Sequence, residues 1–171
     1  MICPSCAHDN ITGTDTCAEC GGSLAHLYEE GEADTLGVLA EPLTHLNPRP
    51  AECVDLSTPM VEVMARLKGK NVGCVQVVDE DRKLVGIFTE RDVLYKVAGL
   101  IKDLDRIVVE SLMTANPTAL QPQTAIQHAL HLMSVYGFRH IPVIDEGNRP
   151  VGIVSFRDVV GFIERHFAPR S

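Results

Sequence analysis

The chain carries one sequence pattern twice. Val85–Val93 reads Val-Gly-Ile-Phe-Thr-Glu-Arg-Asp-Val, and 66 positions later Val151–Val159 reads Val-Gly-Ile-Val-Ser-Phe-Arg-Asp-Val. The same offset aligns Val77–Glu80 with Val143–Glu146 without a gap. An internal repeat of this length constrains the architecture before any single residue is interpreted. Two copies favour a pair of similar units related by a pseudo-twofold axis over an open solenoid.

Each copy has the same predicted order of elements, β-α-β-β-α. A short strand precedes an amphipathic helix, for which Thr58 and Thr124 are the expected caps. Two strands joined by a turn follow, and a closing helix starts near Thr89 or Ser155. We expect strands at 51–56, 74–78 and 84–88 in the first copy and at 117–120, 140–144 and 150–154 in the second. The fold class is therefore α/β (α+β), with two repeats and a small cysteine-rich unit.

The segment before the repeats has two predicted parts. Residues 25–34 are polar and acidic, which is typical of a linker. Residues 35–46 have leucines at helical spacing, so a leading helix is expected, interrupted at Pro42.

Composition limits the possible partners. The net charge is −8 and the pI is about 5.3, which argues against nonspecific binding to nucleic acid or to an anionic membrane. No apolar run approaches the ~20 residues of a membrane span. The first residues lack the features of a signal peptide, and we expect a cytoplasmic protein.

Four cysteines near the start form two C-x-x-C pairs, which predicts a closed site for a structural Zn²⁺ ion. Disulfides or a redox motif are the alternatives, but so short a segment needs a metal or a crosslink to fold. The predicted ligands are Cys3, Cys6, Cys17 and Cys20. Residues 1–24 resemble the zinc-ribbon family, with Ala7 where the first glycine is usual. The segment contains no Lys or Arg, so contact with a protein partner is favoured over nucleic acid.

The repeated motif places a hydroxyl and a carboxylate three residues apart, as Thr89 with Asp92 and as Ser155 with Asp158. One interpretation is a capping box, in which the two side chains bind free backbone N–H groups at the start of a helix. The other is a ligand site, where N–H groups and a hydroxyl bind phosphate and a carboxylate accepts from a ribose diol. The sequence leaves both interpretations open.

The repeats resemble the CBS domain family. The motif Gly-x-x-Thr/Ser-x-x-Asp and the run Arg139–Asp145 carry this resemblance, which covers residues 46–104 and 105–167. It implies a first CBS domain at 35–104, including the leading helix, and a second at 105–171. Tandem CBS domains form a pair, or Bateman module, that binds AMP, ADP, ATP or S-adenosylmethionine and commonly dimerises. The resemblance therefore implies a regulatory protein that senses an adenosyl ligand.

The second repeat is the preferred ligand site, because the first has Gly73 in place of Arg139 and Glu52 in place of Thr118. An inward Glu52 would repel a phosphate, whereas arginine binds phosphate well. The preferred ligand-binding residues are Thr118, Leu120, Arg139, His140, Ile141, Pro142, Ser155, Arg157 and Asp158. The weaker candidates, in the first repeat, are Val54, Val75, Thr89, Arg91 and Asp92.

Two functional hypotheses follow. In the first, an adenosyl ligand regulates the pair, and the ribbon or a partner protein responds to it. In the second, the pair has lost its ligand and acts as a dimerising scaffold whose ribbon docks a protein. We expect no enzyme activity, because no nucleophile is paired with a base.

Overall fold

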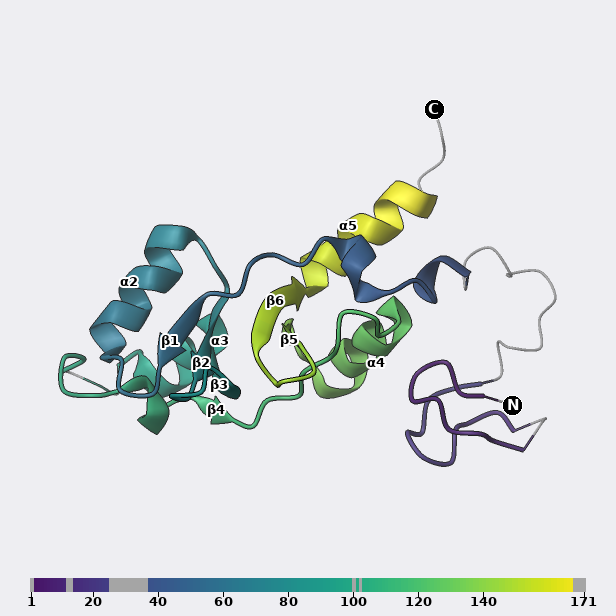
Figure 1. Ribbon diagram of the computed structural model, residues 1–171, viewed down its shortest axis with the longest axis horizontal. Helices are drawn as coiled ribbons and strands as arrows, with labels where there is room; N and C mark the ends of the chain where they lie inside the picture. Colours follow the sequence, from purple (N-terminus) through teal and green to yellow (C-terminus); the bar gives the residue numbers. More distant parts are fainter. Residues whose placement is uncertain (1, 12–13, 25–36, 100, 102, 168–171) are drawn as a thin grey trace. The chain divides into compact units, whose positions relative to one another are not determined.

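The computed structural model describes residues 2–11, 14–24, 37–99, 101 and 103–167 (Figure 1). The predicted linker, 25–34, lies outside the described residues. The chain divides into two compact units. The first consists of Met1–Asn47, Pro122–Arg139 and Ser155–Ser171, and the second of Pro48–Gln121 and His140–Val154.

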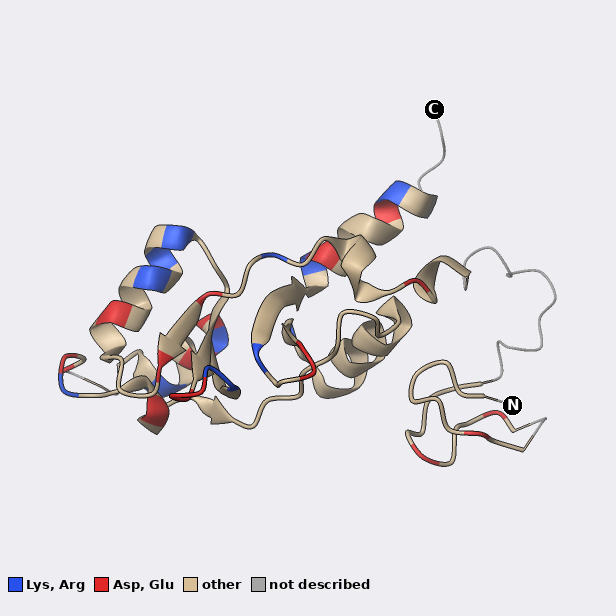
Figure 2. Cartoon of the chain, in the orientation of Figure 1, with Lys and Arg blue, Asp and Glu red and all other residues tan. Residues whose placement is uncertain are grey.

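The second unit contains a four-stranded sheet with the order β1-β2-β3-β4. Its strands are β1 (Cys53–Asp55), β2 (Cys74–Val78), β3 (Leu84–Thr89) and β4 (Thr114–Ala115). Strand β1 is parallel to β2, and the other pairs are antiparallel. Helix α2 (Met60–Lys70) packs against β2, and its last turn carries Lys68 and Lys70 (Figures 1 and 2). The core beneath this helix consists of Val54, Met60, Val63, Leu67, Val75, Val77, Phe88, Val97 and Val109.

The second repeat contributes a two-stranded sheet, β5 (His140–Ile144) and β6 (Pro150–Ser155). The predicted strand at 117–120 is reduced to Leu120, which bridges Val143 in parallel. The four strands predicted around the two turns are confirmed. The turns also match: Asp79 N–H donates to the Lys83 carbonyl at 3.0 Å, and Asp145 N–H donates to the Arg149 carbonyl at 3.0 Å.

The segments that lead into the repeats exchange partners, which the sequence did not predict. Strand β4 lies near the start of the second repeat but pairs with Gly86 and Ile87 of the first. Arg49 lies near the start of the first repeat but pairs with Ile153 of the second, through backbone bonds of 3.1 and 2.9 Å. Glycine permits this approach, because a Cβ at Gly86 would lie 2.2 Å from Met113 Sδ. The glycines of the repeated motif, Gly86 and Gly152, therefore leave space for the segment at the start of the other repeat.

The first unit contains the 3₁₀ helix η2 (Leu43–Leu46), α4 (Ile126–Tyr136) and α5 (Phe156–Phe167). Residues 37–39 are helical, and the helix stops before Pro42, as expected. Pro42 bridges Ala125, and Leu43 N–H donates to the Thr124 carbonyl at 2.9 Å. Helices α4 and α5 pack together, with Ile126, Ala129, Met133 and Phe162 buried.

The prediction that Thr58 and Thr124 cap their helices is wrong. Pro59 and Ala125 occupy the N-cap positions, and no side chain there makes a capping hydrogen bond. Other backbone segments bind the first helical N–H groups instead. Met60 N–H donates to the Ile107 carbonyl at 2.8 Å, and Ile126 N–H donates to the Glu41 carbonyl at 2.9 Å. With these donors satisfied, a hydroxyl cap is not required.

The two closing helices differ in length. In the first repeat, α3 (Glu90–Asp92) passes directly into the π-helix η3 (Val93–Val97), where Ala98 N–H donates to the Val93 carbonyl at 2.8 Å. In the second repeat, α5 continues for 12 residues. The repeated sequence at these starts therefore does not dictate how far the helix extends.

Candidate functional site

The repeated hydroxyl and carboxylate form reciprocal capping boxes in both repeats. Asp92 Oδ2 accepts from Thr89 N–H at 2.9 Å and from Thr89 Oγ1 at 2.7 Å. Asp158 Oδ2 accepts from Ser155 N–H at 2.7 Å and from Ser155 Oγ at 2.6 Å. The hydroxyl oxygens accept in return from Asp92 N–H at 3.3 Å and Asp158 N–H at 3.4 Å. Each motif thus orients one carboxylate at the start of a helix.

A backbone bond links each motif to the residue before its neighbouring strand. Glu90 N–H donates to the Gly73 carbonyl, and Phe156 N–H donates to the Arg139 carbonyl, both at 3.0 Å. Position 139 therefore lies beside the start of α5, next to Ser155 and Asp158. The Arg139 side chain is exposed, so its guanidinium is accessible to an anion.

Lys96 distinguishes the first motif from the second. Its ammonium donates to Asp92 Oδ1 at 2.8 Å and to the Leu112 carbonyl at 2.8 Å. Burial works to raise the pKa of Asp92, but hydrogen bonds from Lys96 and Thr89 outweigh it and hold the pKa below its usual value. Sequence reasoning missed Lys96, although the spacing of four residues from Asp92 is a recognised signal for an ion pair.

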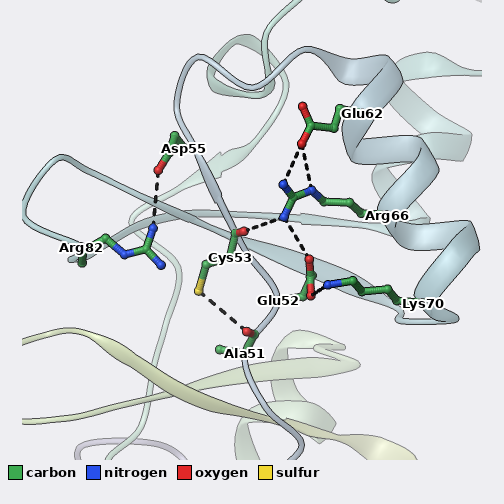
Figure 3. A network of polar contacts seen from close by, with 8 residues as sticks. All are labelled: Ala51, Glu52, Cys53, Asp55, Glu62, Arg66, Lys70 and Arg82. Atoms are coloured by element: carbon green, nitrogen blue, oxygen red, sulfur yellow. Dashed lines mark hydrogen bonds and ion pairs between the residues drawn. The ribbon is translucent and has the colours of Figure 1, made fainter.

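Glu52 lies in a network of charged groups between β1 and α2 (Figure 3). Its carboxylate accepts from Arg66 Nη1 at 3.1 Å and from Lys70 Nζ at 2.7 Å, and its side chain is 15% exposed. Arg66 also donates to the Cys53 carbonyl at 3.2 Å and to Glu62. Burial opposes ionisation of Glu52, but the two cations hold its pKa below the usual value. The Glu52 carboxylate thus has a structural role, because it binds two cationic side chains of α2.

Two more first-repeat substitutions have structural partners. Gln76, in the position of Pro142, is 1% exposed and donates from Nε2 to the Gly152 carbonyl at 3.0 Å. Its buried Oε1 has no hydrogen-bond partner within the described residues. Gly73, in the position of Arg139, admits the His140 ring, because a Cβ there would lie 2.3 Å from His140 Nε2. The absence of a side chain at Gly73 therefore leaves space for the His140 ring.

The predicted second-repeat residues fall in both compact units. In one unit, Ser155 is buried, Asp158 is half-buried, and the Arg139 and Arg157 side chains are exposed. In the other, Leu120 N–H donates to the Pro142 carbonyl at 3.0 Å. There Ile141 and Pro142 are buried, His140 is half-buried, and Thr118 is exposed. Their joint role in binding stays a prediction.

The weaker candidates all lie in the second unit. Val54 and Val75 are 3% and 0% exposed and belong to the hydrophobic core under α2. Thr89 and Asp92 form the first capping box, and Arg91 beside them is exposed. The structure thus gives Val54 and Val75 a packing role whatever else they contact.

The four N-terminal cysteines converge, with all Sγ atoms within 4.8 Å of one another. Cys3 and Cys20 are 3.7 Å apart at sulfur, and Cys6 and Cys17 are 3.5 Å apart. A tetrahedral Zn²⁺ site with Zn–S bonds of ~2.3 Å requires sulfur separations of about 3.8 Å. The donor set therefore fits such an ion.

Two similar turns hold these cysteines. Ala7 N–H donates to the Cys3 carbonyl, and Gly21 N–H donates to the Cys17 carbonyl, both at 2.9 Å. Ala7 and Gly21 both have a left-handed backbone, with φ of 59° and 69°. The glycine expected in the first turn is replaced by an alanine that adopts the same conformation. Figure 2 marks acidic but no basic residues along the described part of this segment.

Asn10 joins the two turns and was missed by sequence reasoning. It is 7% exposed, donates from Nδ2 to the His8 carbonyl at 3.0 Å and to Cys17 Sγ at 3.4 Å, and accepts at Oδ1 from Ala18 N–H at 2.9 Å. Burial works to raise the pKa of Cys17, but backbone N–H donors and Asn10 lower it to about 6. Burial raises the pKa of Cys6 to about 12. Asn10 therefore both supports the turns and favours a thiolate at Cys17.

A family model for the CBS domain matches residues 45–99 and 109–165. The chain therefore belongs to the CBS domain family and contains a tandem pair. The mixed α/β architecture matches that of solved CBS pairs. In this family the pair is generally regulatory.

Individual relatives agree with this assignment. An uncharacterized 17.7 kDa protein of Acidianus ambivalens is 35% identical over 100 residues, which are 58% of this chain and 59% of the relative. The chain spans about half to three fifths of the length of the first curated relatives. The CBS pair of protein MJ0100, solved with 5′-methylthioadenosine and S-adenosyl-L-methionine, is 27% identical, with a TM-score of 0.64 over 71% of this chain and 98% of that one. Protein PAE2072 of Pyrobaculum aerophilum, solved with AMP, is 25% identical, with a TM-score of 0.63 over 68% and 88%.

No described helix has both the length and the apolar character required to cross a membrane.

Proposed function

We propose that this protein is a regulatory sensor that binds an adenosyl ligand, AMP, ADP, ATP or S-adenosylmethionine, at its second CBS repeat. The observation that carries the proposal is the Ser155–Asp158 pair, which holds a hydroxyl and a carboxylate together beside the backbone of Arg139. Solved CBS pairs with bound adenosyl compounds support the ligand class.

Each predicted residue has a chemical role in this proposal. The Asp158 carboxylate accepts from the ribose hydroxyls, and Arg139 and Arg157 bind phosphate oxygens when the ligand has them. His140 is a further donor near the phosphate. The residues proposed to surround the adenine are Thr118, Leu120, Ile141 and Pro142. Thr89, Arg91 and Asp92, with Val54 and Val75, remain the weaker set.

The ribbon, residues 1–24, is proposed to bind a structural Zn²⁺ ion through Cys3, Cys6, Cys17 and Cys20. Four protein thiolates leave no open position on the metal, so its role is to fold the segment. The acidic surface of the ribbon favours a protein partner over nucleic acid. We also propose a homodimer formed through the CBS pair, domain boundaries at 35–104 and 105–171, a cytoplasmic location and a regulatory rather than catalytic role.

A ligand screen by thermal unfolding tests the sensor proposal. Saturation at ~100-fold over the Kd should stabilise the native state by about 2.7 kcal/mol. We expect a rise in Tm with at least one of AMP, ADP, ATP and S-adenosylmethionine, and a much smaller rise in Asp158→Asn. An unchanged Tm with all four would contradict the proposal.

The alternative is a scaffold without a ligand, in which the pair dimerises and the ribbon docks a protein. One observation favours it: the first repeat uses Glu52 and Asp92 for internal ion pairs. If the scaffold alternative is correct, Asp158→Ala lowers the free energy of unfolding by about 1 kcal/mol, the value of a helix cap, and has no other effect.

A further inference from the structure

The two cysteine turns of the ribbon repeat the same backbone contacts 14 positions apart, from Cys3 to Cys17. Cys3 N–H donates to the His8 carbonyl, and Cys17 N–H donates to the Gly22 carbonyl, both at 2.8 Å. The isolated β-bridges that flank the turns follow the same offset, as Ile2 with Asp9 and Thr16 with Ser23. The two turns are therefore equivalent in their backbone hydrogen bonds.

The equivalent positions Asn10 and Leu24 differ in chemistry. Leu24 is 0% exposed and packs in one apolar cluster with Cys3 and Cys17. Asn10 is 7% exposed, so it is nearly as buried as Leu24. A leucine side chain has no hydrogen-bond donor or acceptor, whereas an amide has both. Of these two positions, only that of Asn10 can therefore form side-chain hydrogen bonds.

The Asn10 amide binds one residue of the first turn and two of the second. Its Nδ2 donates to the His8 carbonyl at 3.0 Å and to Cys17 Sγ at 3.4 Å. Its Oδ1 accepts from Ala18 N–H at 2.9 Å. The bonds to Cys17 and to the residue after it orient the sulfur relative to the amide, and the bond to His8 orients the amide relative to the first turn.

The hydrogen bond to Cys17 Sγ also affects the charge of the site. Four thiolates carry more negative charge than one Zn²⁺ ion neutralises. The ribbon contains no Lys or Arg that could offset the excess, so hydrogen-bond donors have to stabilise the sulfurs. Asn10 supplies such a donor from a buried position, where a hydrogen bond is electrostatically stronger than in water.

We infer that Asn10 is a positioning residue of the metal site, and that its hydrogen bond to Cys17 Sγ raises the Zn²⁺ affinity of the ribbon. The inference rests on the proposed Zn²⁺ site at the four cysteines. Asn10 acts through Cys17 and through the link between the turns, and is not itself a ligand.

Metal titration of the full-length protein tests this inference, with Co²⁺ and then competing Zn²⁺ as the probes. Asn10→Leu places at position 10 the residue found at position 24. We expect it to weaken the binding of both metals about 10- to 100-fold, as the loss of an outer-shell partner typically does. Thr14→Val is the matched control, since it also removes a side-chain hydrogen bond within the ribbon, from Oγ1 to the Ile11 carbonyl. Thr14→Val should bind both metals as the wild type does.

The absorption band of the Co²⁺-loaded protein separates the bond to sulfur from a merely structural role. Charge transfer from thiolate to Co²⁺ needs less energy when the sulfur has lost a donor, because the hydrogen bond stabilises its electron pairs. We expect the band of Asn10→Leu at saturating Co²⁺ to move to lower energy, and that of Thr14→Val to stay in place. If Asn10→Leu does not fold with the metal, Asn10→Ala removes the same donor with a smaller side chain and gives the same test.

The affinity and the band together decide the outcome. Weaker binding with a shifted band supports the inference. An unchanged affinity overturns it. Weaker binding with an unchanged band also overturns it, because Asn10 would then act only on the backbone of the turns. A wild type that binds neither metal contradicts the proposed Zn²⁺ site and overturns the inference with it.

Discussion

Asp92 of the first repeat is bound by Lys96, whereas the corresponding position of the second repeat holds the buried Phe162. The surrounding backbone bonds are nearly the same, including the 3.0 Å contacts at Gly73 and Arg139. Backbone features such as turns and caps need only one or two residue types, so both repeats retain them. The side chains around them are free to diverge. In the first repeat Glu52 and Asp92 form internal ion pairs, and in the second repeat Arg139 and Arg157 are exposed.

The largest expected difference is in phosphate binding. Arg139→Ala should weaken AMP binding about 10- to 100-fold, since a charged hydrogen bond contributes ~1.5–3 kcal/mol. Binding of S-adenosylmethionine, which has no phosphate, should change far less. Isothermal titration calorimetry with both ligands measures the two effects. Equal losses for the two ligands would show that Arg139 acts on the fold and not on phosphate.

The Asp92 carboxylate should contribute to stability both as a helix cap and as the partner of Lys96. Asp92→Ala removes a cap and the partner of Lys96, so it should lower the free energy of unfolding by about 2 kcal/mol. Asp158→Ala also removes a cap, which by itself contributes about 1 kcal/mol. Urea unfolding followed by circular dichroism measures both. If Lys96→Ala is already present, Asp92→Ala should cost only about 1 kcal/mol, the value of the cap. An equal loss from Asp92→Ala with and without Lys96→Ala would mean that the Lys96 ion pair contributes nothing.

The same ion pair predicts a dependence on pH. The pKa of Asp92 lies below its usual value, so its contribution is present above the unfolded pKa of about 3.9 and is lost as pH falls through the native pKa. The difference in unfolding free energy between the wild type and Asp92→Asn should therefore be constant near neutral pH and should shrink in acid. Urea unfolding between about pH 2 and pH 7 would show this. A difference that grows in acid would be the wrong sign.

The smallest expected effect is at the turn between β2 and β3. Arg82 has a φ of 65°, and its counterpart Asn148 has a φ of 62°. Asparagine tolerates this left-handed region better than arginine does, so Arg82→Asn should stabilise the protein by about 0.5 kcal/mol. The exposed Arg82–Asp55 pair that it removes is worth little. The reverse change, Asn148→Arg, should destabilise, because Asn148 Nδ2 also donates to the Leu84 carbonyl. Thermal unfolding of both variants would reveal any departure from these opposite signs.

Local sequence signals predicted the parts of the fold that depend on local chemistry. Short apolar runs on either side of the two turns located β2, β3, β5 and β6, and Thr89 and Ser155 were identified as helix starts. The threonine caps at Thr58 and Thr124 failed, because distant carbonyls had already satisfied the helix N–H groups. The exchange of leading segments also depends on contacts between residues far apart in sequence, which one sequence does not reveal.

The site was predicted less completely than the fold. The cysteines that converge were identified from their spacing. Asn10 was not, since its bonds to both turns exist only when the ribbon is folded. Lys96 could have been found, because a lysine four residues after an aspartate on a helix is a known ion-pair pattern. A comparison of the repeats by charge, not only by motif, would have identified it.

Titration calorimetry of AMP and S-adenosylmethionine into the wild type, Asp158→Asn and Asp92→Asn tests the second-repeat site most directly. The two substitutions are matched, since each removes one carboxylate charge from one repeat. We predict about 100-fold weaker binding for Asp158→Asn, from the loss of charged hydrogen bonds to ribose, and an affinity within about twofold of the wild type for Asp92→Asn. Unchanged affinity in a correctly folded Asp158→Asn protein would contradict a ligand site at the second repeat.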